Sequence, residues 1–226
     1  MKVTSLLARV ALALISLAVF AVPVVRAAEP TDEKVLVDQA SITLRDFMSA
    51  KEMGWFRKSI EKANGVMIVP GMYKAGLLIG GSGGKGVFLA RDGKTGEWRG
   101  PAFYNMGSVN IGLQIGAEKS EIILLAMNKE ALDILMSPSF KLGTDASVAA
   151  GPVGVGIAGS TAQIPTAAFV AYARSKGAYV GLTLDGAVVK NDEDANEAYY
   201  GRKTGPEEIN PPAHFLRKII RNGNRN

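Results

Sequence analysis

The stretch from residue 66 to residue 91, VMIVPGMYKAGLLIGGSGGKGVFLAR, decides the fold class of this chain. Short apolar runs alternate in it with breaks that contain glycine or proline, a pattern typical of short strands joined by tight turns. The expected strands are 66–69, stopped by Pro70-Gly71, then 75–80 and 85–91, with Gly81-Ser82-Gly83-Gly84 as the turn between the last two. The stretch therefore predicts successive antiparallel hairpins.

Further segments extend this pattern toward the C-terminus. They are the turn Asp92-Gly93-Lys94-Thr95-Gly96, an alternating strand at 108–117, a continuous apolar strand at 121–127, a strand at 151–159 with glycines on one face, and a hairpin of 166–174 with 178–184. The run at 121–127 is expected to be covered on both faces. So many short strands predict a largely antiparallel, glycine-rich β-sheet curved into a barrel- or sandwich-like core.

Helical periodicity precedes the sheet and returns in short segments after it begins. Residues 31–48 predict an amphipathic helix with Thr31 as its N-cap, and 52–64 predict a second one with Gly65 as a left-handed C-terminal cap. A short helix at 129–136, capped by Asn128, and another within 191–200 complete the set. We expect an α+β fold in which the N-terminal amphipathic helices and the mid-chain helix pack on the sheet.

Residues 1–27 have the pattern of a secretory signal peptide. Lys2 and Arg9 precede an apolar run, and small residues follow it, so cleavage is expected after Ala27 or Ala28. An uncleaved N-terminal anchor is the alternative. The predicted organisation is a signal peptide at 1–27, one domain at 31–205 and a basic tail at 206–226, in an exported protein that is periplasmic or secreted and that can associate peripherally with a membrane.

The composition offers little material for catalysis. The chain has no cysteine and a single histidine, which leaves almost nothing for thiolate metal sites, multi-histidine metal sites or a Ser-His-Asp triad. Asp192, Glu193 and Asp194 are adjacent, but acidic residues there suit the start of a helix. We therefore expect no enzyme, no cofactor and no metal, although a carboxylate pair stays formally open.

Two further ligand classes are disfavoured by context. Gly81-Ser82-Gly83-Gly84-Lys85-Gly86 satisfies G-x-G-x-x-G, but a strand follows it where a dinucleotide fingerprint requires a helix. The aromatic residues fall mostly at strand positions, where they fill a core and do not stack on bases. Neither nucleotide nor nucleic-acid binding is expected.

The ordered motifs resemble those of the SYLF family, also called the yeast actin-binding SYLF-type family. The matching stretches are Gly65-Val66-Met67-Ile68-Val69-Pro70, Lys74-Ala75-Gly76, Gly80-Gly81-Ser82-Gly83-Gly84-Lys85-Gly86-Val87, Trp98-Arg99-Gly100-Pro101-Ala102-Phe103, Gly112-Leu113-Gln114-Ile115-Gly116, Leu142-Gly143-Thr144-Asp145, Ala149-Ala150-Gly151-Pro152-Val153-Gly154, Tyr172-Ala173-Arg174-Ser175-Lys176-Gly177 and Gly181-Leu182-Thr183-Leu184-Asp185-Gly186.

The resemblance implies a non-enzymatic lipid-binding module, with phosphoinositide binding in eukaryotic members and actin bundling in some fungal ones. An exported chain would meet phospholipids and not filamentous actin, so anionic membrane phospholipid is the expected partner and actin is not. The candidate lipid-binding residues are Arg45, Lys51, Arg57, Lys58, Lys62, Lys74, Lys85, Arg217, Lys218 and Arg221. The alternative is a structural or interaction protein of the envelope, with an unknown protein partner and no specific lipid.

Overall fold

The computed structural model describes residues 31–76, 79–111, 116–154, 166–181 and 184–209. The predicted signal peptide, and the predicted tail from residue 210 on, lie outside the described residues. Everything below concerns the domain that begins at Thr31, which forms one compact unit by its internal contacts.

The helices lie close to where the sequence predicts them. They are α2 (Asp32–Ser49), the 3-10 turn η1 (Lys51–Met53), α3 (Gly54–Lys62), α4 (Lys129–Leu135) and α5 (Glu193–Tyr200). Thr31 is the N-cap residue of α2 but makes no side-chain cap hydrogen bond. Asn128 caps α4 by accepting a hydrogen bond from the backbone N–H of Ala131 at 2.8 Å, as the sequence predicts.

The expected left-handed cap at Gly65 is wrong. Helix α3 ends at Ala63 in an extended conformation, with φ −70° and ψ 141°, and Gly65 already belongs to the first strand. A Cβ at Gly65 would lie 2.8 Å from the ring of Phe88, so the glycine provides space for an aromatic side chain and not a helix cap.

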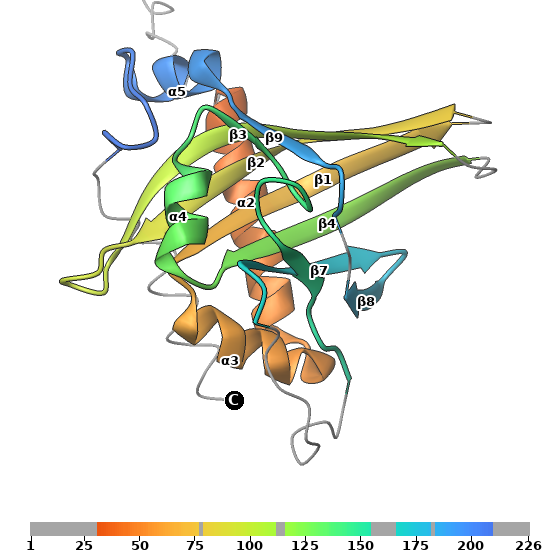
Figure 1. The fold of residues 1–226 in the computed structure, drawn as a ribbon. Coiled ribbons are helices and arrows are strands. Elements are labelled where there is room, and N and C mark those ends of the chain that lie inside the picture. Colours follow the sequence, from red (N-terminus) through yellow and green to blue (C-terminus); the bar gives the residue numbers. More distant parts are fainter. Residues whose placement is uncertain (1–30, 77–78, 112–115, 155–165, 182–183, 210–226) are drawn as a thin grey trace, which may run out of the picture. The chain divides into compact units, whose positions relative to one another are not determined.

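Nine strands within the described residues form one sheet (Figure 1). They are β1 (Gly65–Gly76), β2 (Ile79–Arg91), β3 (Trp98–Ile111), β4 (Gly116–Ala126), β5 (Ser139–Lys141), β6 (Val148–Ala150), β7 (Phe169–Ser175), β8 (Ala178–Gly181) and β9 (Val188–Asn191). The order is β5-β9-β3-β2-β1-β4-β7-β6, with β8 also on β7, and only the β6–β7 pair is parallel. The predicted α+β class with a largely antiparallel, curved sheet is confirmed.

The chain connectivity forces this sheet to curl. Strands β5 and β6 stand at opposite ends of the order, which in a flat sheet would separate them by about 34 Å at 4.8 Å per strand. Only residues 142–147 join them, a connection that reaches about 25 Å at most. The rings of Phe140 on β5 and Phe169 on β7 stack with centroids 5.9 Å apart, so the two ends meet across the concave side of a half-barrel.

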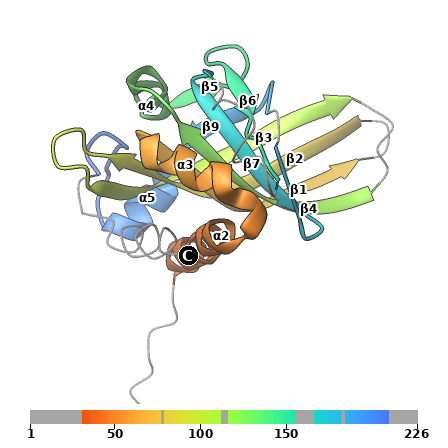
Figure 2. The same ribbon diagram turned by 90° about the horizontal axis from the view of Figure 1, so that it is seen from below.

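The two faces of the sheet carry separate cores. On β1, Met67 and Val69 point to the concave, inner side, which α4 covers, while Val66 and Ile68 point to the outer side, which α2 and α3 cover (Figure 2). Strand β4 is buried on both faces, as the sequence predicts for this apolar run. Burial of both faces explains why the run has no alternating pattern.

Two long strands replace the short ones expected at 66–91. Strand β1 continues past Pro70-Gly71, where the register with both neighbours shifts, so the predicted stop is a bulge. Strand β2 runs without interruption through Gly81-Ser82-Gly83-Gly84, so the predicted turn there is wrong. Glycine permits this because β1 passes very close: a Cβ at Gly84 would lie 2.4 Å from the carbonyl oxygen of Gly71.

Two other predicted strands differ from what the structure shows. Residues 151–154 are not a strand, and the rest of the expected strand at 151–159 lies outside the described residues. The expected strand at 108–117 contains the end of β3 at Ile111 and the start of β4 at Gly116, with 112–115 outside the described residues. The predicted hairpin around Ser175-Lys176-Gly177 is confirmed as β7–β8.

A side-chain clamp fixes α2 on the outer side of the sheet. Arg174 on β7 forms an ion pair with Asp46 of α2 at 2.8 Å and a second, shorter one with Glu121 of β4. Thr43 of α2 donates a hydrogen bond to Glu121 at 3.2 Å. These contacts set the position of α2 relative to the strands beside it.

Candidate ligand-binding site

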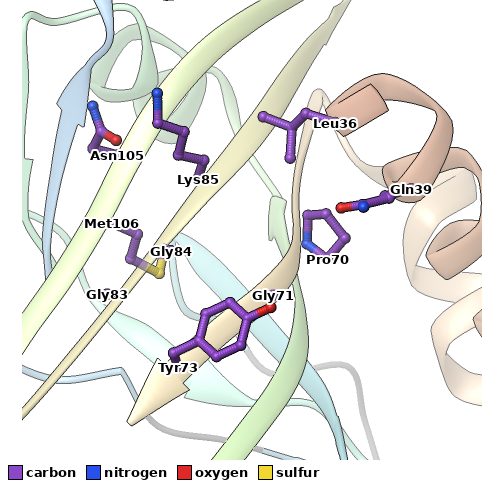
Figure 3. Close-up of a pocket in the computed structure, with 10 residues that line it drawn as sticks. All are labelled: Leu36, Gln39, Pro70, Gly71, Tyr73, Gly83, Gly84, Lys85, Asn105 and Met106. Atoms are coloured by element: carbon purple, nitrogen blue, oxygen red, sulfur yellow. The ribbon is translucent and has the colours of Figure 1, made fainter. Parts of the chain in front are cut away.

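A hollow of about 550 Å³ lies where the N-terminal half of α2 faces the middle of β1, β2 and β3 (Figure 3). Its lining residues are Leu36, Gln39, Pro70, Gly71, Tyr73, Gly83, Gly84, Lys85, Asn105 and Met106. In Figure 3, Leu36 and Gln39 approach from the helix, while Lys85 and Asn105 lie side by side on neighbouring strands. The hollow thus combines an apolar floor with a few polar groups, the usual composition of a small-molecule site.

Lys85 is the charged group of this hollow. Its ammonium lies 2.9 Å from the carboxylate of Asp192, with 60% of the lysine side chain exposed and 10% of the aspartate. Asp192 is also the N-cap of α5, where its Oδ1 accepts from the backbone N–H of Ala195 at 3.2 Å. The cap fixes Asp192, and Asp192 in turn holds the exposed lysine at the rim.

The ion pair shifts the pKa values of both Lys85 and Asp192. The hydrogen bond to Asp192 raises the pKa of Lys85 above its ordinary value, although burial acts the other way, and the charges of Glu33 and Asp32 add to the rise. Burial alone would raise the pKa of Asp192, but the hydrogen bonds from Lys85 and from Ala195 outweigh it and hold that pKa below its ordinary value. Both groups are therefore charged near neutral pH, and an anionic ligand must compete with Asp192 for Lys85.

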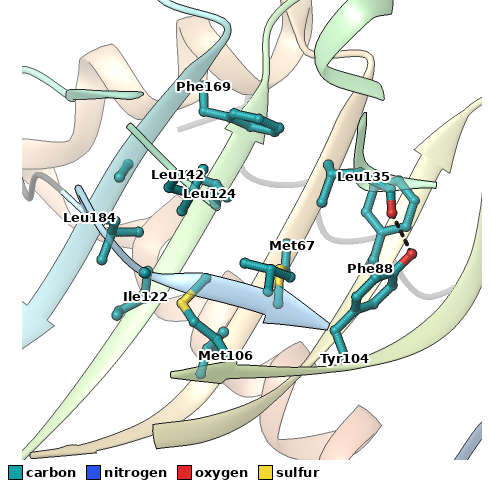
Figure 4. Close-up of a cluster of buried hydrophobic side chains, with 14 of the residues drawn as sticks. Met67, Phe88, Tyr104, Met106, Ile122, Leu124, Leu135, Leu142, Phe169 and Leu184 are labelled. Atoms are coloured by element: carbon teal, nitrogen blue, oxygen red, sulfur yellow. Dashed lines mark hydrogen bonds between the residues drawn. The ribbon is translucent and has the colours of Figure 1, made fainter. Parts of the chain in front are cut away.

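The concave side of the sheet is occupied by protein side chains (Figure 4). Met67, Phe88, Leu124 and Phe169 are among the buried residues that fill it. The hydroxyl of Tyr104 donates to the carbonyl oxygen of Leu135 at 2.5 Å, and burial raises the pKa of this phenol. The barrel interior is thus packed as a core, and a ligand site lies more naturally outside it.

A second hollow, of about 460 Å³, has five acidic residues and one lysine in its lining around α5. The acidic residues are Glu193, Asp194, Glu197, Glu207 and Glu208. Like charges make it a poor site for an anion.

The remaining predicted residues lie elsewhere. Arg45, Lys51, Lys58 and Lys62 are exposed along α2, η1 and α3, and Lys74 is half-buried on β1. Of the predicted residues that the structure describes, only Lys85 lines the first hollow. Arg217, Lys218 and Arg221 lie outside the described residues.

Arg57 has a local structural contact that the sequence does not reveal. Its guanidinium donates to the carbonyl oxygens of Met48 at 3.0 Å and Ala50 at 2.7 Å, which closes the C-terminal end of α2. Lys58 lies 4.9 Å above the ring of Trp55 and keeps its ammonium exposed. Arg57 is therefore partly engaged, while Lys58 presents its charge to solvent.

Sequence reasoning missed Asp192, Asn105 and Tyr73 as parts of this site. Asp192 was predicted only as part of a helix start, which is confirmed, but its pairing with Lys85 joins residues far apart in the chain. Among the described residues, no group of three or more His, Asp or Glu could hold a metal ion. No helix among them is long and apolar enough to cross a membrane.

The sequence motifs resemble those of the SYLF family, and a comparison with known families supports that resemblance. The chain belongs to this family, also called Ysc84, since residues 107–211 match the family described as "Las17-binding protein actin regulator".

Several curated relatives are similar over most of the chain. Protein YSC84 of Saccharomyces cerevisiae is 29% identical over 71% of this chain and 36% of its own length. SH3 domain-containing YSC84-like protein 1 of Homo sapiens is 31% identical over 62% of this chain and 41% of its own length. LAS seventeen-binding protein 3 of Saccharomyces cerevisiae is 31% identical over 63% of this chain and 31% of its own. The chain thus spans well under half the length of these relatives.

Proposed function

We propose that this domain binds anionic phospholipid headgroups at a membrane surface, without catalysing a reaction. The observation that carries the proposal is the hollow beside α2, where the exposed ammonium of Lys85 borders the bare backbone of Gly83. A lipid phosphate is an anion that a lysine ammonium can pair with directly. Glycine lets such a group approach the strand closely.

The other lining groups suit the rest of a headgroup. The amides of Gln39 and Asn105 can donate and accept hydrogen bonds with hydroxyl and ester oxygens. Leu36, Pro70 and Met106 offer an apolar surface to the glycerol region. The volume of the hollow falls within the range of small-molecule sites, about 300–1,000 Å³.

The exposed cations of the helical surface support attraction to an anionic membrane. A cation close to such a surface contributes about 1 kcal/mol, and less with distance; Arg45, Lys51, Lys58 and Lys62, with the predicted basic tail, are candidates for this attraction. Contributions of this size must act together, which makes binding sensitive to salt.

We place this activity at the cell envelope, because the first 27 residues have the pattern of a signal peptide. Fractionation of cells that produce the full chain tests this placement. We expect a protein in the envelope or medium, shortened at its N-terminus after Ala27 or Ala28. Full-length protein in the cytoplasm would contradict it.

Vesicle co-sedimentation tests the proposed lipid binding. We expect binding to phosphatidylcholine vesicles that contain phosphatidylglycerol, loss of binding at high salt, and little binding to phosphatidylcholine alone. Lys85→Gln should weaken binding about fivefold or more, since it removes one cation and leaves Asp192 unpaired at the rim. Lys94→Gln, at the exposed β2–β3 turn, is the control and should change little. Absence of binding at every lipid composition would contradict the proposal.

The alternative function is a structural or protein-interaction role without a specific lipid. The family description and the relatives' names favour it, because they refer to Las17 binding and to SH3 domains. Those names describe other proteins, of which this chain matches only part. Failure of vesicle binding, together with a defined protein partner of the purified domain, would favour this alternative.

A further inference from the structure

The outer side of the sheet is covered over only part of its length. Val87, Phe103 and Ile123 are buried there in the core that α2 and α3 complete. Two to four residues further along the same strands and on the same face, Lys85, Asn105 and Lys119 are exposed. Figures 1 and 2 show these parts of β1–β4 extending beyond the helices.

Strand register makes this exposed region continuous. Val188, Gly107, Gly83, Tyr73 and Lys119 are consecutive partners across β9, β3, β2, β1 and β4. Directly paired residues point to the same face, so these five positions form one row. Four strand spacings give the row a length of about 19 Å.

Apolar and cationic side chains share this face. Tyr73 is 61% exposed, Val109 79% and Val188 43%, and together they make up half of the exposed large hydrophobic residues among those described. Lys85, Lys119 and Lys190 are exposed beside them. We call the surface formed by these six residues the outer sheet face.

The charge of the outer sheet face is mainly positive. Lys119 and Lys190 form no ion pair in the described part of the chain, and Lys119 lies 5.7 Å above the ring of Tyr73. The positive charge of Lys85 is balanced by its ion pair with Asp192 at the border with α5. The negative charges of Asp32 and Glu33 on α2 also interact with Lys85. The net cationic character therefore comes from Lys119 and Lys190, at opposite borders of the face.

The glycines at its centre are not explained by the fold. A Cβ at Gly81 or Gly83 would have a single neighbour within 4 Å, a backbone oxygen at 3.8 or 3.9 Å, and neither residue has a positive φ. Gly84 and Gly86, whose positions point to the inner side, would instead place a Cβ within 3 Å of β1. Packing thus requires the inner glycines, whereas the outer ones leave a flat backbone surface open.

We infer that the outer sheet face is the surface on which the domain docks on an anionic bilayer, with Tyr73 and Val109 entering the interfacial region. This inference rests on the proposed lipid binding and specifies its orientation. Aromatic and aliphatic side chains flanked by lysines suit an interface that is apolar on one side and anionic on the other. A second copy of the chain fits less well, because a two-fold contact would place lysines against lysines.

Tryptophan reporters test the orientation directly. Tyr73→Trp is compared with Ile42→Trp, a matched control at a 53% exposed position on α2, against the baseline of Trp55 and Trp98. With phosphatidylglycerol vesicles that carry brominated acyl chains, we expect added quenching for Tyr73→Trp only. Quenching of Ile42→Trp alone would overturn the inference and leave lipid binding intact, whereas absence of wild-type binding would remove the proposed function itself.

Paired lysine variants test the charge. Lys119→Ala with Lys190→Ala should weaken binding about 25-fold, at about fivefold for each lysine. Lys58→Ala with Lys62→Ala, on α3, removes the same charge and should have a smaller effect. A larger loss from the α3 pair would assign docking to the helices and overturn the inference.

Gly83→Asp places a negative charge at the centre of the face, with Gly83→Asn as its neutral control. We expect both variants to remain folded by circular dichroism, and the aspartate variant to bind vesicles several-fold more weakly than the asparagine variant. Sedimentation velocity of the same proteins tests whether a second copy of the chain covers this face instead of a membrane. A wild-type dimer that Gly83→Asp dissociates would make this face a homodimer interface and overturn the inference.

Discussion

Adjacent glycines on β2 should respond to alanine in opposite directions. At Gly84 the new Cβ would lie 2.4 Å from the carbonyl oxygen of Gly71 and 2.9 Å from Cγ1 of Val69. An ordinary contact requires about 1 Å more, and the obstacle is backbone, so Gly84→Ala should destabilise by about 3 kcal/mol, the upper end for overpacking. At Gly83 the Cβ meets only an oxygen at 3.9 Å. Gly83→Ala should stabilise by about 0.4–1 kcal/mol by restricting the unfolded chain.

Thermal and urea unfolding, followed by circular dichroism, measure both variants. For a domain of this size we expect Gly84→Ala to lower Tm by about 6–12 °C and Gly83→Ala to raise it by a few degrees. Equal destabilisation by the two substitutions would refute the assignment of Gly83 to an open face. A neutral Gly84→Ala would refute the close passage of β1 over β2.

Three further predictions concern contacts around the site. Arg57→Ala should lower the free energy of unfolding by about 1–2 kcal/mol, because two carbonyls at the end of α2 lose a charged donor; an unchanged urea midpoint would contradict this. Asp192→Asn should be less stable than wild type at neutral pH. Folding lowers the pKa of Asp192, so the stability difference between the two proteins should disappear as pH falls below about 4. Folding raises the pKa of Lys85, so the same difference should also shrink above about pH 10.5. A constant difference from pH 3 to pH 11 would argue against the ion pair. Burial raises the pKa of Tyr172 to about 12, so folding should lose stability as pH rises from 10 to 12, and Tyr172→Phe combined with Ser59→Ala should make that loss smaller; an undiminished loss would assign it to other groups.

Local signals in the sequence predicted the elements that depend on neighbouring residues. Asp92 accepts hydrogen bonds from the backbone N–H groups of Lys94 and Thr95, at 2.8 and 2.9 Å, in the predicted turn. Asn128 caps its helix where expected, the acidic residues from Asp192 on stand at a helix start as expected, and the apolar run of β4 is buried on both faces. Each of these features is decided within a few residues, so pattern and turn chemistry were sufficient.

Glycine was misread because its meaning depends on what lies opposite. The string Gly81-Ser82-Gly83-Gly84 has the composition of a turn, yet it lies within β2. Close passage of β1 explains the inner glycine, and an open surface surrounds the outer one. Gly65 similarly gives space to Phe88, a residue on another strand.

The sequence by itself determined the class of fold, the approximate positions of the helices, the cap at Asn128 and the family. The tertiary structure alone decided that the sheet curls until Phe140 meets Phe169, that Lys85 pairs with Asp192, and that Tyr73 and Lys119 share one face with Gly83. The physical reason is the distance along the chain that separates the residues involved in each feature. Caps, turns and periodicity act between neighbours along the chain, whereas strand order, ion pairs and exposed faces arise only when distant segments are brought together.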